Sequence, residues 1–247
     1  MKIQNKTAII TGGTQGIGAS TALELAQKGY HIALVARHSG DGALQKEIEK
    51  KGVSCHTIEA DLGHEDSCSK IAQEVDEMLG NIYALIHCAG GAAPGSLLNV
   101  SREIWYQAFD IHIHAAFHLS RSVVPYMRKN KEGFITFISS AAGIRGVKNA
   151  LAYAVVKGAL PQLTRCLAFE LSDDNIRVNC VAPGVIRTRF QDFLTPEQVK
   201  NNLENRIPLH KEGSPDEVAA VIAMLIDNGF ITGENIIIDG GMSMRVV

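Results

Sequence analysis

One stretch decides the fold: Thr7-Ala8-Ile9-Ile10-Thr11-Gly12-Gly13-Thr14-Gln15-Gly16-Ile17-Gly18. Residues 7–11 form a short apolar run typical of a strand, and the glycine-rich turn after them leads into helical spacing over 22–26. Glycine allows a sharp turn and a close approach of the backbone to a ligand, and the free N–H groups at the start of a helix attract anions. The order strand, glycine turn and helix therefore indicates a site for the pyrophosphate of a dinucleotide. Taken alone, the turn is also compatible with a purely geometric connection.

Six further strand-like runs follow the first, which lies near 6–11. They lie near 31–36, 54–59, 82–88, 133–139, 176–181 and 235–239, and helical patterns separate them. This alternation predicts an α/β fold over 1–247: a doubly wound, Rossmann-type sheet of seven parallel strands in a single domain, with helices on both faces. Ligands of such sheets bind beyond the carboxyl ends of the strands. The residues expected at those ends are Gly12, Asp61, Ala89, Ser140 and Pro183.

Composition narrows the classes of partner. The formal net charge of the 247 residues is −2, which indicates neither a nucleic-acid nor a membrane partner. We find no signal peptide and no run of about 18 apolar residues that would span a membrane. The five cysteines form no C-x-x-C pair and leave one over, as expected for reduced thiols in the cytoplasm.

Tyr153 and Lys157 stand four residues apart in a helical stretch, so they share one face of the helix. A positive charge about 4 Å from a phenol is worth roughly 4 kcal/mol at an effective dielectric of about 20, which lowers the phenol pKa by about three units. A tyrosine tuned in this way is a general acid or base for a carbonyl or an alcohol. Ser140 is placed to bond the same oxygen. For an isolated Tyr-x-x-x-Lys, a core tyrosine with a snorkelling lysine is the alternative.

Taken together, the glycine turn and these three residues resemble the short-chain dehydrogenase/reductase family. Further landmarks of that family appear in order: Asp61-Leu62, Ala89-Gly90, the stretch 179–188, Ile231-Thr232-Gly233-Glu234 and Asp239-Gly240-Gly241. The resemblance implies that Ser140, Tyr153 and Lys157 are catalytic. It implies cofactor contacts from Gly12, Thr14, Gln15, Gly16, Ile17, Gly18, Asp61, Leu62, Ala89, Gly90, Tyr153, Lys157, Pro183, Gly184, Ile186 and Thr188. Among these, Asp61 is expected at the adenine, Lys157 at the nicotinamide ribose, and Ile186 and Thr188 at the carboxamide.

The end of the second strand bears on the choice between NAD and NADP. An NAD enzyme usually carries an acidic residue there, and this chain has Ala36 followed by Arg37 and His38. A guanidinium suits the 2′-phosphate of NADP, so Arg37 with His38 predicts NADP(H) in preference to NAD(H). Gln15 takes the place of a second basic residue found in many NADP relatives. The alternative for Arg37 is an ordinary solvated charge.

Two departures from the family pattern concern histidines. His87 and Cys88 replace the two asparagines that usually precede Ala89-Gly90, and His112 replaces the asparagine of the active site. We interpret His112 as a fourth catalytic residue that relays protons, since a free imidazole has a pKa of about 6.5. The alternative is that His112 only packs. His114 and His118 have helical spacing too, but no further ligands complete a set, so no metal site is expected.

The predicted function is an NADP(H)-dependent oxidoreductase that interconverts a ketone and a secondary alcohol, with a small-molecule substrate. Two alternatives are a 3-oxoacyl-carrier-protein reductase, which Asp174 disfavours because that position beside the cleft is basic in such enzymes, and a nucleotide-binding protein with weakened catalysis. A substrate loop is expected over 188–213. The resemblance also implies a homotetramer that pairs through helices near 101–128 and 150–172 and through the last strand.

Overall fold

Seven parallel strands form one sheet in the computed structural model, which describes residues 5–192 and 194–244. The strands are β1 (Thr7–Thr11), β2 (His31–Ala36), β3 (Cys55–Glu59), β4 (Ile82–His87), β5 (Gly133–Ile138), β6 (Ile176–Pro183) and β7 (Asn235–Ile238). Their order across the sheet is β3-β2-β1-β4-β5-β6-β7. The predicted doubly wound sheet is therefore confirmed, and the largest difference in a strand boundary is at β6, which extends two residues further than expected.

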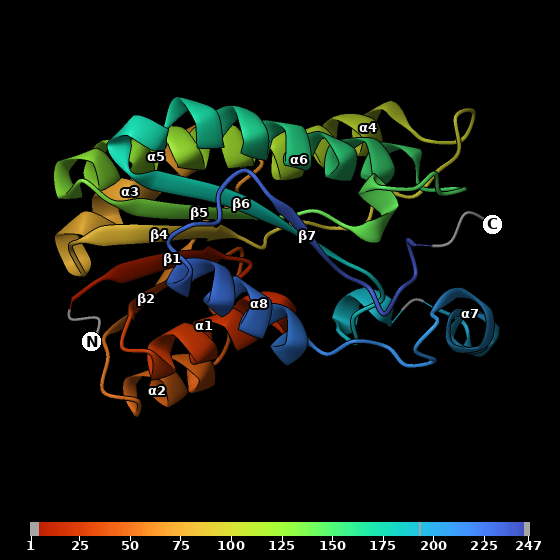
Figure 1. Cartoon of the computed structure of the whole chain (residues 1–247), viewed down its shortest axis with the longest axis horizontal. Helices are drawn as coiled ribbons and strands as arrows, with labels where there is room; N and C mark the ends of the chain where they lie inside the picture. The colour runs from red at the N-terminus through yellow and green to blue at the C-terminus, as the bar shows by residue number, and fades with distance from the viewer. Residues whose placement is uncertain (1–4, 193, 245–247) are drawn as a thin grey trace.

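Helices cover both faces of this sheet (Figure 1). The helices are α1 (Gly16–Gln27), α2 (Ala43–Glu49), α3 (Glu65–Met78), α4 (Arg102–Phe109), α5 (Ala115–Asn130), α6 (Leu151–Glu170), α7 (Pro196–Asn201) and α8 (Pro215–Asp227). Figure 1 shows α3, α5 and α6 over one face and α1, α2 and α8 over the other. Two apolar clusters fill these layers, and strand residues alternate between them: Ile9 and Leu85 face α3 and α5, whereas Ile10 and Ile86 face α1 and α8. Burial on both faces explains why the strands read as continuous apolar runs.

The long helix expected over 101–128 is divided. It begins at the N-cap Ser101, whose side chain accepts from the Ile104 N–H, and α4 ends at Phe109. A π turn over Asp110–His114 then separates α4 from α5, with the Ala115 N–H donating to the Asp110 carbonyl five residues back. The chain is thus helical from Arg102 to Asn130, as expected, and the π turn within this stretch is the feature that the sequence did not indicate. Single π turns are frequent at functional sites, and this one contains His112.

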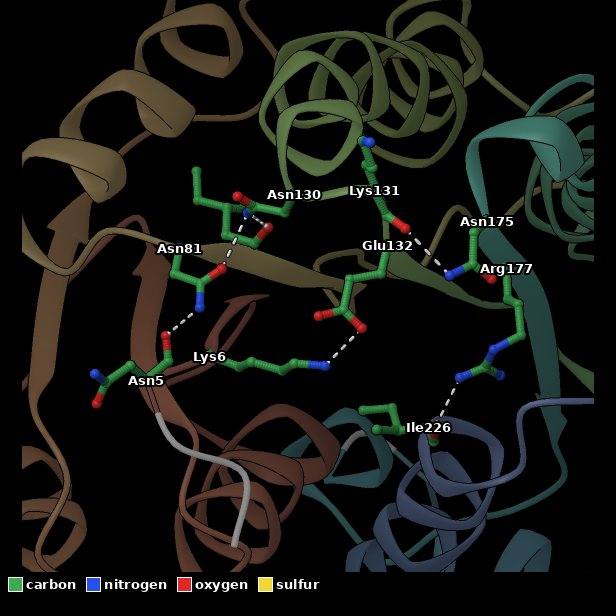
Figure 2. Close-up of polar contacts among 10 residues, drawn as sticks. Asn5, Lys6, Asn81, Asn130, Lys131, Glu132, Asn175, Arg177 and Ile226 are labelled. Carbon is green, nitrogen blue, oxygen red and sulfur yellow. Dashed lines mark hydrogen bonds and ion pairs between the residues drawn. The ribbon is translucent and has the colours of Figure 1, made fainter. Parts of the chain in front are cut away.

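Polar contacts join the loops at the amino ends of the strands (Figure 2). Lys6 Nζ donates to the Glu132 carboxylate at 2.8 Å, and the Asn81 side chain donates to the Asn5 carbonyl at 2.6 Å. The Asn175 side chain donates to the Lys131 carbonyl at 3.1 Å. These contacts occupy the end of the sheet opposite to the glycine turn.

The positions of Lys131 and Asp174 correct one expectation. Each residue lies just before a strand, Lys131 before β5 and Asp174 before β6, so both are at the amino end of the sheet and not beside the cleft at its carboxyl end. Asp174 also forms an ion pair with Arg128, with Nε and Oδ2 2.7 Å apart. Within one subunit, the charge of Asp174 is therefore no argument against an acyl-carrier substrate.

Candidate active site

The glycine turn between β1 and α1 has the geometry of a ligand cradle. Gly12 and Gly16 have φ angles of 60° and 53°, which residues with a Cβ atom adopt only at an energetic cost. A Cβ at Gly18 would overlap the Gly12 carbonyl oxygen. The N-cap of α1 is Gln15, whose side chain makes no capping hydrogen bond, so the first N–H groups of the helix have no side-chain acceptor there. A bare backbone beside a helix N-terminus fits the pyrophosphate of a dinucleotide.

Several of the other predicted cofactor residues lie next to this turn. A Cβ placed on Gly12 would be 3.0 Å from Ala89, and one placed on Gly16 would be 3.2 Å from Thr188 Cγ2. Ile186 and Pro183 are buried at the end of β6, and Leu62 is buried in the core with only 3% of its surface exposed. Asp61 is exposed and accepts from the Gly63 N–H at 3.0 Å. The structure thus brings the turn, Ala89 and Thr188 together, and the Leu62 side chain packs in the apolar core.

An acidic residue that the sequence analysis missed lies beside the end of β2. Glu59, the last residue of β3, pairs in register with Ala36. Its carboxylate accepts from the Ser39 N–H at 2.7 Å and from the Ser39 hydroxyl, and these bonds lower the pKa of Glu59. Arg37 and His38 are exposed next to it. Because both strands were expected, aligning their ends would have found Glu59.

Ser140, Tyr153 and Lys157 come together where β5 meets α6. Ser140 follows β5 and caps a turn over Ala141–Gly143, where its hydroxyl accepts from the Ala142 N–H at 3.2 Å, and it acts on the pKa of the nearby Tyr153 phenol. Lys157 Nζ lies 5.6 Å from the centre of the Tyr153 ring and donates to the Ile138 carbonyl at 2.7 Å. The Ser139 hydroxyl donates to the Lys157 carbonyl at 2.7 Å, which ties the end of β5 to α6.

The pKa of Tyr153 differs from the sequence-based expectation. Burial raises the pKa of this phenol, and the hydrogen bond from Ser140 acts in the opposite direction without overcoming it. Burial also lowers the pKa of Lys157 from 10.5 to about 8. The expected lowering of the Tyr153 pKa by Lys157 is therefore not found in this structure, since burial is the largest influence on the pKa of each group.

His112 is buried in the π turn, edge-on to Tyr153, with ring centres 5.9 Å apart and an angle of 84° between the planes. His112 Nε2 lies 3.1 Å from the Gly91 carbonyl oxygen and 3.4 Å from the Gly91 N–H. The shorter contact makes Nε2 the protonated nitrogen, because a carbonyl only accepts. Nδ1 then has no hydrogen-bond partner within 5–192 and 194–244.

The environment of His112 keeps its ring neutral. Burial, with the charge of Lys157 added, holds the pKa of His112 well below 6.5. The expectation that His112 titrates near its ordinary pKa is therefore wrong. The two neighbouring histidines are occupied elsewhere: His114 pairs with Asp110 at 2.9 Å and His118 with Glu65 at 3.5 Å. Among the residues that the structure describes, no three potential ligands gather in a metal-binding group.

Backbone hydrogen bonds join the two ends of the segment expected to form a substrate loop, and one of its side chains lies beside Tyr153. Gly213 N–H donates to the Val185 carbonyl, and Arg187 N–H donates to the Gly213 carbonyl, both at 2.9 Å. Between these points, the Phe190 ring lies 6.0 Å from the Tyr153 ring. Further along the same segment, α7 is followed by a π turn over Asn202–Arg206.

Comparisons with known proteins agree with this geometry. The family model described as enoyl-(acyl carrier protein) reductase matches residues 12–243. A 3-oxoacyl-(acyl-carrier-protein) reductase of Thermotoga maritima is 33% identical, with 98% of this chain and 99% of the relative covered. Dehydrogenase/reductase SDR family member 4 of Oryctolagus cuniculus is 32% identical, with 99% and 96% covered.

Solved structures give the same result. An acetoin dehydrogenase of Salmonella typhimurium superposes with a TM-score of 0.88 at 31% identity, covering 98% of this chain and 97% of that one. A short-chain type dehydrogenase/reductase of Mycobacterium ulcerans gives 0.92 at 27% identity, covering 99% and 92%. Sheet, glycine turn and catalytic residues together define a dinucleotide-dependent dehydrogenase or reductase. The chain belongs to the short-chain dehydrogenase/reductase family. As a member, it is an oxidoreductase of CH–OH groups with a nicotinamide dinucleotide as cofactor.

Proposed function

We propose that this protein interconverts a small ketone and its secondary alcohol with NADP(H). The observation that carries the proposal is the convergence of Ser140, Tyr153 and Lys157 where β5 meets α6, at the same end of the sheet as the glycine turn. These groups can bind a carbonyl oxygen and exchange a proton with it next to a dinucleotide. The Phe190 ring beside Tyr153 narrows the space over the phenol and favours a small substrate. The segment 188–213 is proposed to cover that substrate.

Each catalytic residue has a distinct role in this proposal. When bound, the nicotinamide supplies or accepts the hydride. Tyr153 gives a proton to the carbonyl oxygen in reduction and takes it back in oxidation, while the Ser140 hydroxyl donates a hydrogen bond to that oxygen. Lys157 holds the nicotinamide ribose and places a positive charge near the developing phenolate. Thr14, Gln15, Ile17, Gly90 and Gly184 are proposed to contact the rest of the cofactor.

A screen of NADPH oxidation tests the reaction class and the substrate together. The panel contains small ketones, hydroxyketones, keto sugars, diketones and β-ketoacyl thioesters, each measured with NADPH and with NADH. We expect turnover of at least one free ketone that exceeds turnover of the thioesters. Binding of NADPH without turnover of any compound would replace the proposal with a protein that only binds the nucleotide.

A carrier-linked acyl substrate is the second candidate. It is supported by the 33% identity to a 3-oxoacyl-(acyl-carrier-protein) reductase over nearly the whole chain. A free small ketone is favoured by Phe190 and by the likeness to an acetoin dehydrogenase, whose substrate is a small hydroxyketone. Faster reduction of a β-ketoacyl thioester than of every free ketone would favour the acyl candidate.

The preference for NADPH is proposed to depend on Arg37 and to be reduced by Glu59. Arg37→Ala should raise KM for NADPH about 10- to 100-fold, because a hydrogen bond to a charged group contributes about 1.5–3 kcal/mol. Glu59→Gln should lower KM for NADPH by about 2- to 5-fold, since it removes a negative charge near the 2′-phosphate and keeps an acceptor for Ser39. Neither change should alter KM for NADH. Arg121→Ala on α5 is the control, and equal effects on both cofactors would contradict these roles.

The protein is proposed to be a cytoplasmic homotetramer. All five cysteines are free, which suits a reducing compartment. Within the described residues, no helix is long and apolar enough to cross a membrane. Phe169 on α6 and Ile237 on β7 expose apolar surface, 87% and 47% respectively, on elements expected to pair between subunits. Sedimentation equilibrium at micromolar concentration should give four times the chain mass of 26.6 kDa. A mass of one chain would refute the assembly.

A further inference from the structure

A directed chain of hydrogen bonds runs from the glycine-turn strand to the π turn through His87. The Ala89 N–H donates to Thr11 Oγ1 at 3.1 Å, and Thr11 Oγ1 lies 2.9 Å from His87 Nδ1. His87 Nε2 lies 3.1 Å from the Ile111 carbonyl oxygen. The ends of β1 and β4 and the start of the π turn are thus connected through one buried imidazole.

The partners determine which nitrogen of His87 carries the proton. The Ile111 carbonyl only accepts, so Nε2 must be the donor. Burial lowers the pKa of His87 to about 4, so the ring is neutral and its one proton is on Nε2. Nδ1 then accepts the hydroxyl hydrogen of Thr11, while Thr11 Oγ1 accepts from the Ala89 N–H.

The bond from His87 reaches the backbone directly before His112. An i to i+5 turn is a less stable geometry than a regular helix, so a contact from outside the helix helps to maintain it. The His112 side chain projects from this turn and packs against Gly90 and Gly91. A Cβ on Gly90 would overlap the His112 ring, and Nε2 of His112 donates to the Gly91 carbonyl. The His112 ring also contacts the Tyr153 ring, with the ring centres 5.9 Å apart. A shift of Ile111 would therefore be transmitted to the phenol.

We propose that His87 is a positioning residue, which fixes the π turn through Ile111 and thereby holds His112 and Tyr153 in their reactive arrangement. This inference rests on the proposed function, because it assigns His87 an effect on the same proton transfer. In this proposal the Nε2–H group of His87 maintains the π turn, whereas in a space-filling role only the volume of the ring would be important.

Three substitutions distinguish the role of Nε2 of His87 from the role of Nδ1. In His87→Gln, the amide nitrogen extends as far as Nε2 and can still donate to the Ile111 carbonyl. In His87→Asn, the shorter amide reaches only the place of Nδ1, and His87→Leu keeps bulk without any polar group. We expect kcat to fall less than about 5-fold for Gln and more than about 20-fold for Asn and Leu. The Kd for NADPH should change less than about 3-fold in all three, because the Ala89–Thr11 bond does not involve His87.

A purely structural role for His87 would give a different pattern. Melting temperatures would then follow the bulk of the side chain, Leu would perform as well as Gln, and kcat of the folded fraction would remain that of the wild type. If the Leu variant fails to fold, the comparison of Gln with Asn still decides, since both are polar amides. Equal kcat for Gln and Asn would overturn the proposal.

A spectroscopic measurement on the wild type tests the same contact without turnover. In ¹⁵N-labelled protein, the His87 ring should give the chemical shifts of the neutral Nε2–H form, unchanged from pH 8 down to pH 5.5. In His87→Leu, the amides of residues 112–116 should exchange with solvent faster than in His87→Gln. An Nδ1–H form would overturn the inference. If the protein oxidises no NADPH with any substrate, the proposed function fails, while these two measurements still decide whether His87 holds the π turn.

Discussion

Tyr153→Phe should lower kcat about 10²- to 10⁴-fold, the range that positioned general acid–base groups contribute. The substitution removes the hydroxyl and keeps the ring that contacts His112 and Phe190. Kd for NADPH should therefore stay within about 3-fold of the wild type. Steady-state kinetics and fluorescence titration of NADPH measure the two quantities. Retention of a tenth or more of kcat would exclude Tyr153 as the proton donor.

Tyr126→Phe is the matched control for this experiment. Tyr126 lies on α5, where it packs against the core and is not part of the catalytic group. The same hydroxyl is removed there, so kcat should remain unchanged. A loss of activity in both variants would indicate a general sensitivity to the loss of a hydroxyl.

Lys157→Met should reduce activity strongly without lowering the melting temperature. The ammonium is nearly inaccessible, 6% exposed, and burial lowers its pKa from 10.5 to about 8. The lowered pKa corresponds to roughly 3 kcal/mol by which the charged ammonium destabilises the folded protein, and this cost is absent in the Met variant. The variant in turn loses about 1–3 kcal/mol with the hydrogen bond to the Ile138 carbonyl, so the two effects nearly cancel. KM for NADPH should rise at least about 10-fold and kcat should fall, because the variant lacks both the ribose contact and the positive charge. Unchanged KM and kcat would remove Lys157 from the proposed machinery.

The lowered pKa of Lys157 also determines in which direction the stability of the protein changes with pH. Lys157 has a lower pKa in the folded protein than in the unfolded chain, so its ammonium destabilises the fold fully below pH 8. This cost disappears as pH rises towards 10.5. The wild type should therefore gain stability relative to Lys157→Met between pH 8 and 10.5, as measured by urea unfolding. Lys50→Met, at the exposed C-cap of α2, is the control, and a difference that does not change with pH would contradict the buried-charge account.

The parts of the molecule that could be predicted from sequence are those with a local cause. Burial on both faces leaves continuous apolar runs, so the strands were found within one or two residues. The glycine turn and the trio Ser140, Tyr153 and Lys157 were recognisable because their spacing is set by a single turn, a strand end and a helix face. Their convergence at one end of the sheet follows from the parallel order of the strands.

The features that escaped prediction depend on contacts between distant segments. The π turn at 110–114 keeps the apolar spacing of an ordinary helix, so the sequence does not distinguish it from one. The pKa values of Tyr153 and His112 are dominated by burial, which the packing of β5, α6 and the π turn determines. Glu59 belongs to a neighbouring strand and becomes visible beside Arg37 only when the strands are aligned. The position of Asp174 at the amino end of the sheet, away from the cleft, likewise follows from the direction of the strands.

The contact between Gly90 and His112 imposes an order on evolutionary change. A side chain at position 90 would overlap the imidazole, so it is tolerated only after His112 has become smaller. The reverse dependence is absent, since a smaller residue at 112 is compatible with glycine at 90. This one-way epistasis means that a smaller residue can replace His112 in one step, whereas position 90 stays fixed as glycine for as long as the imidazole remains.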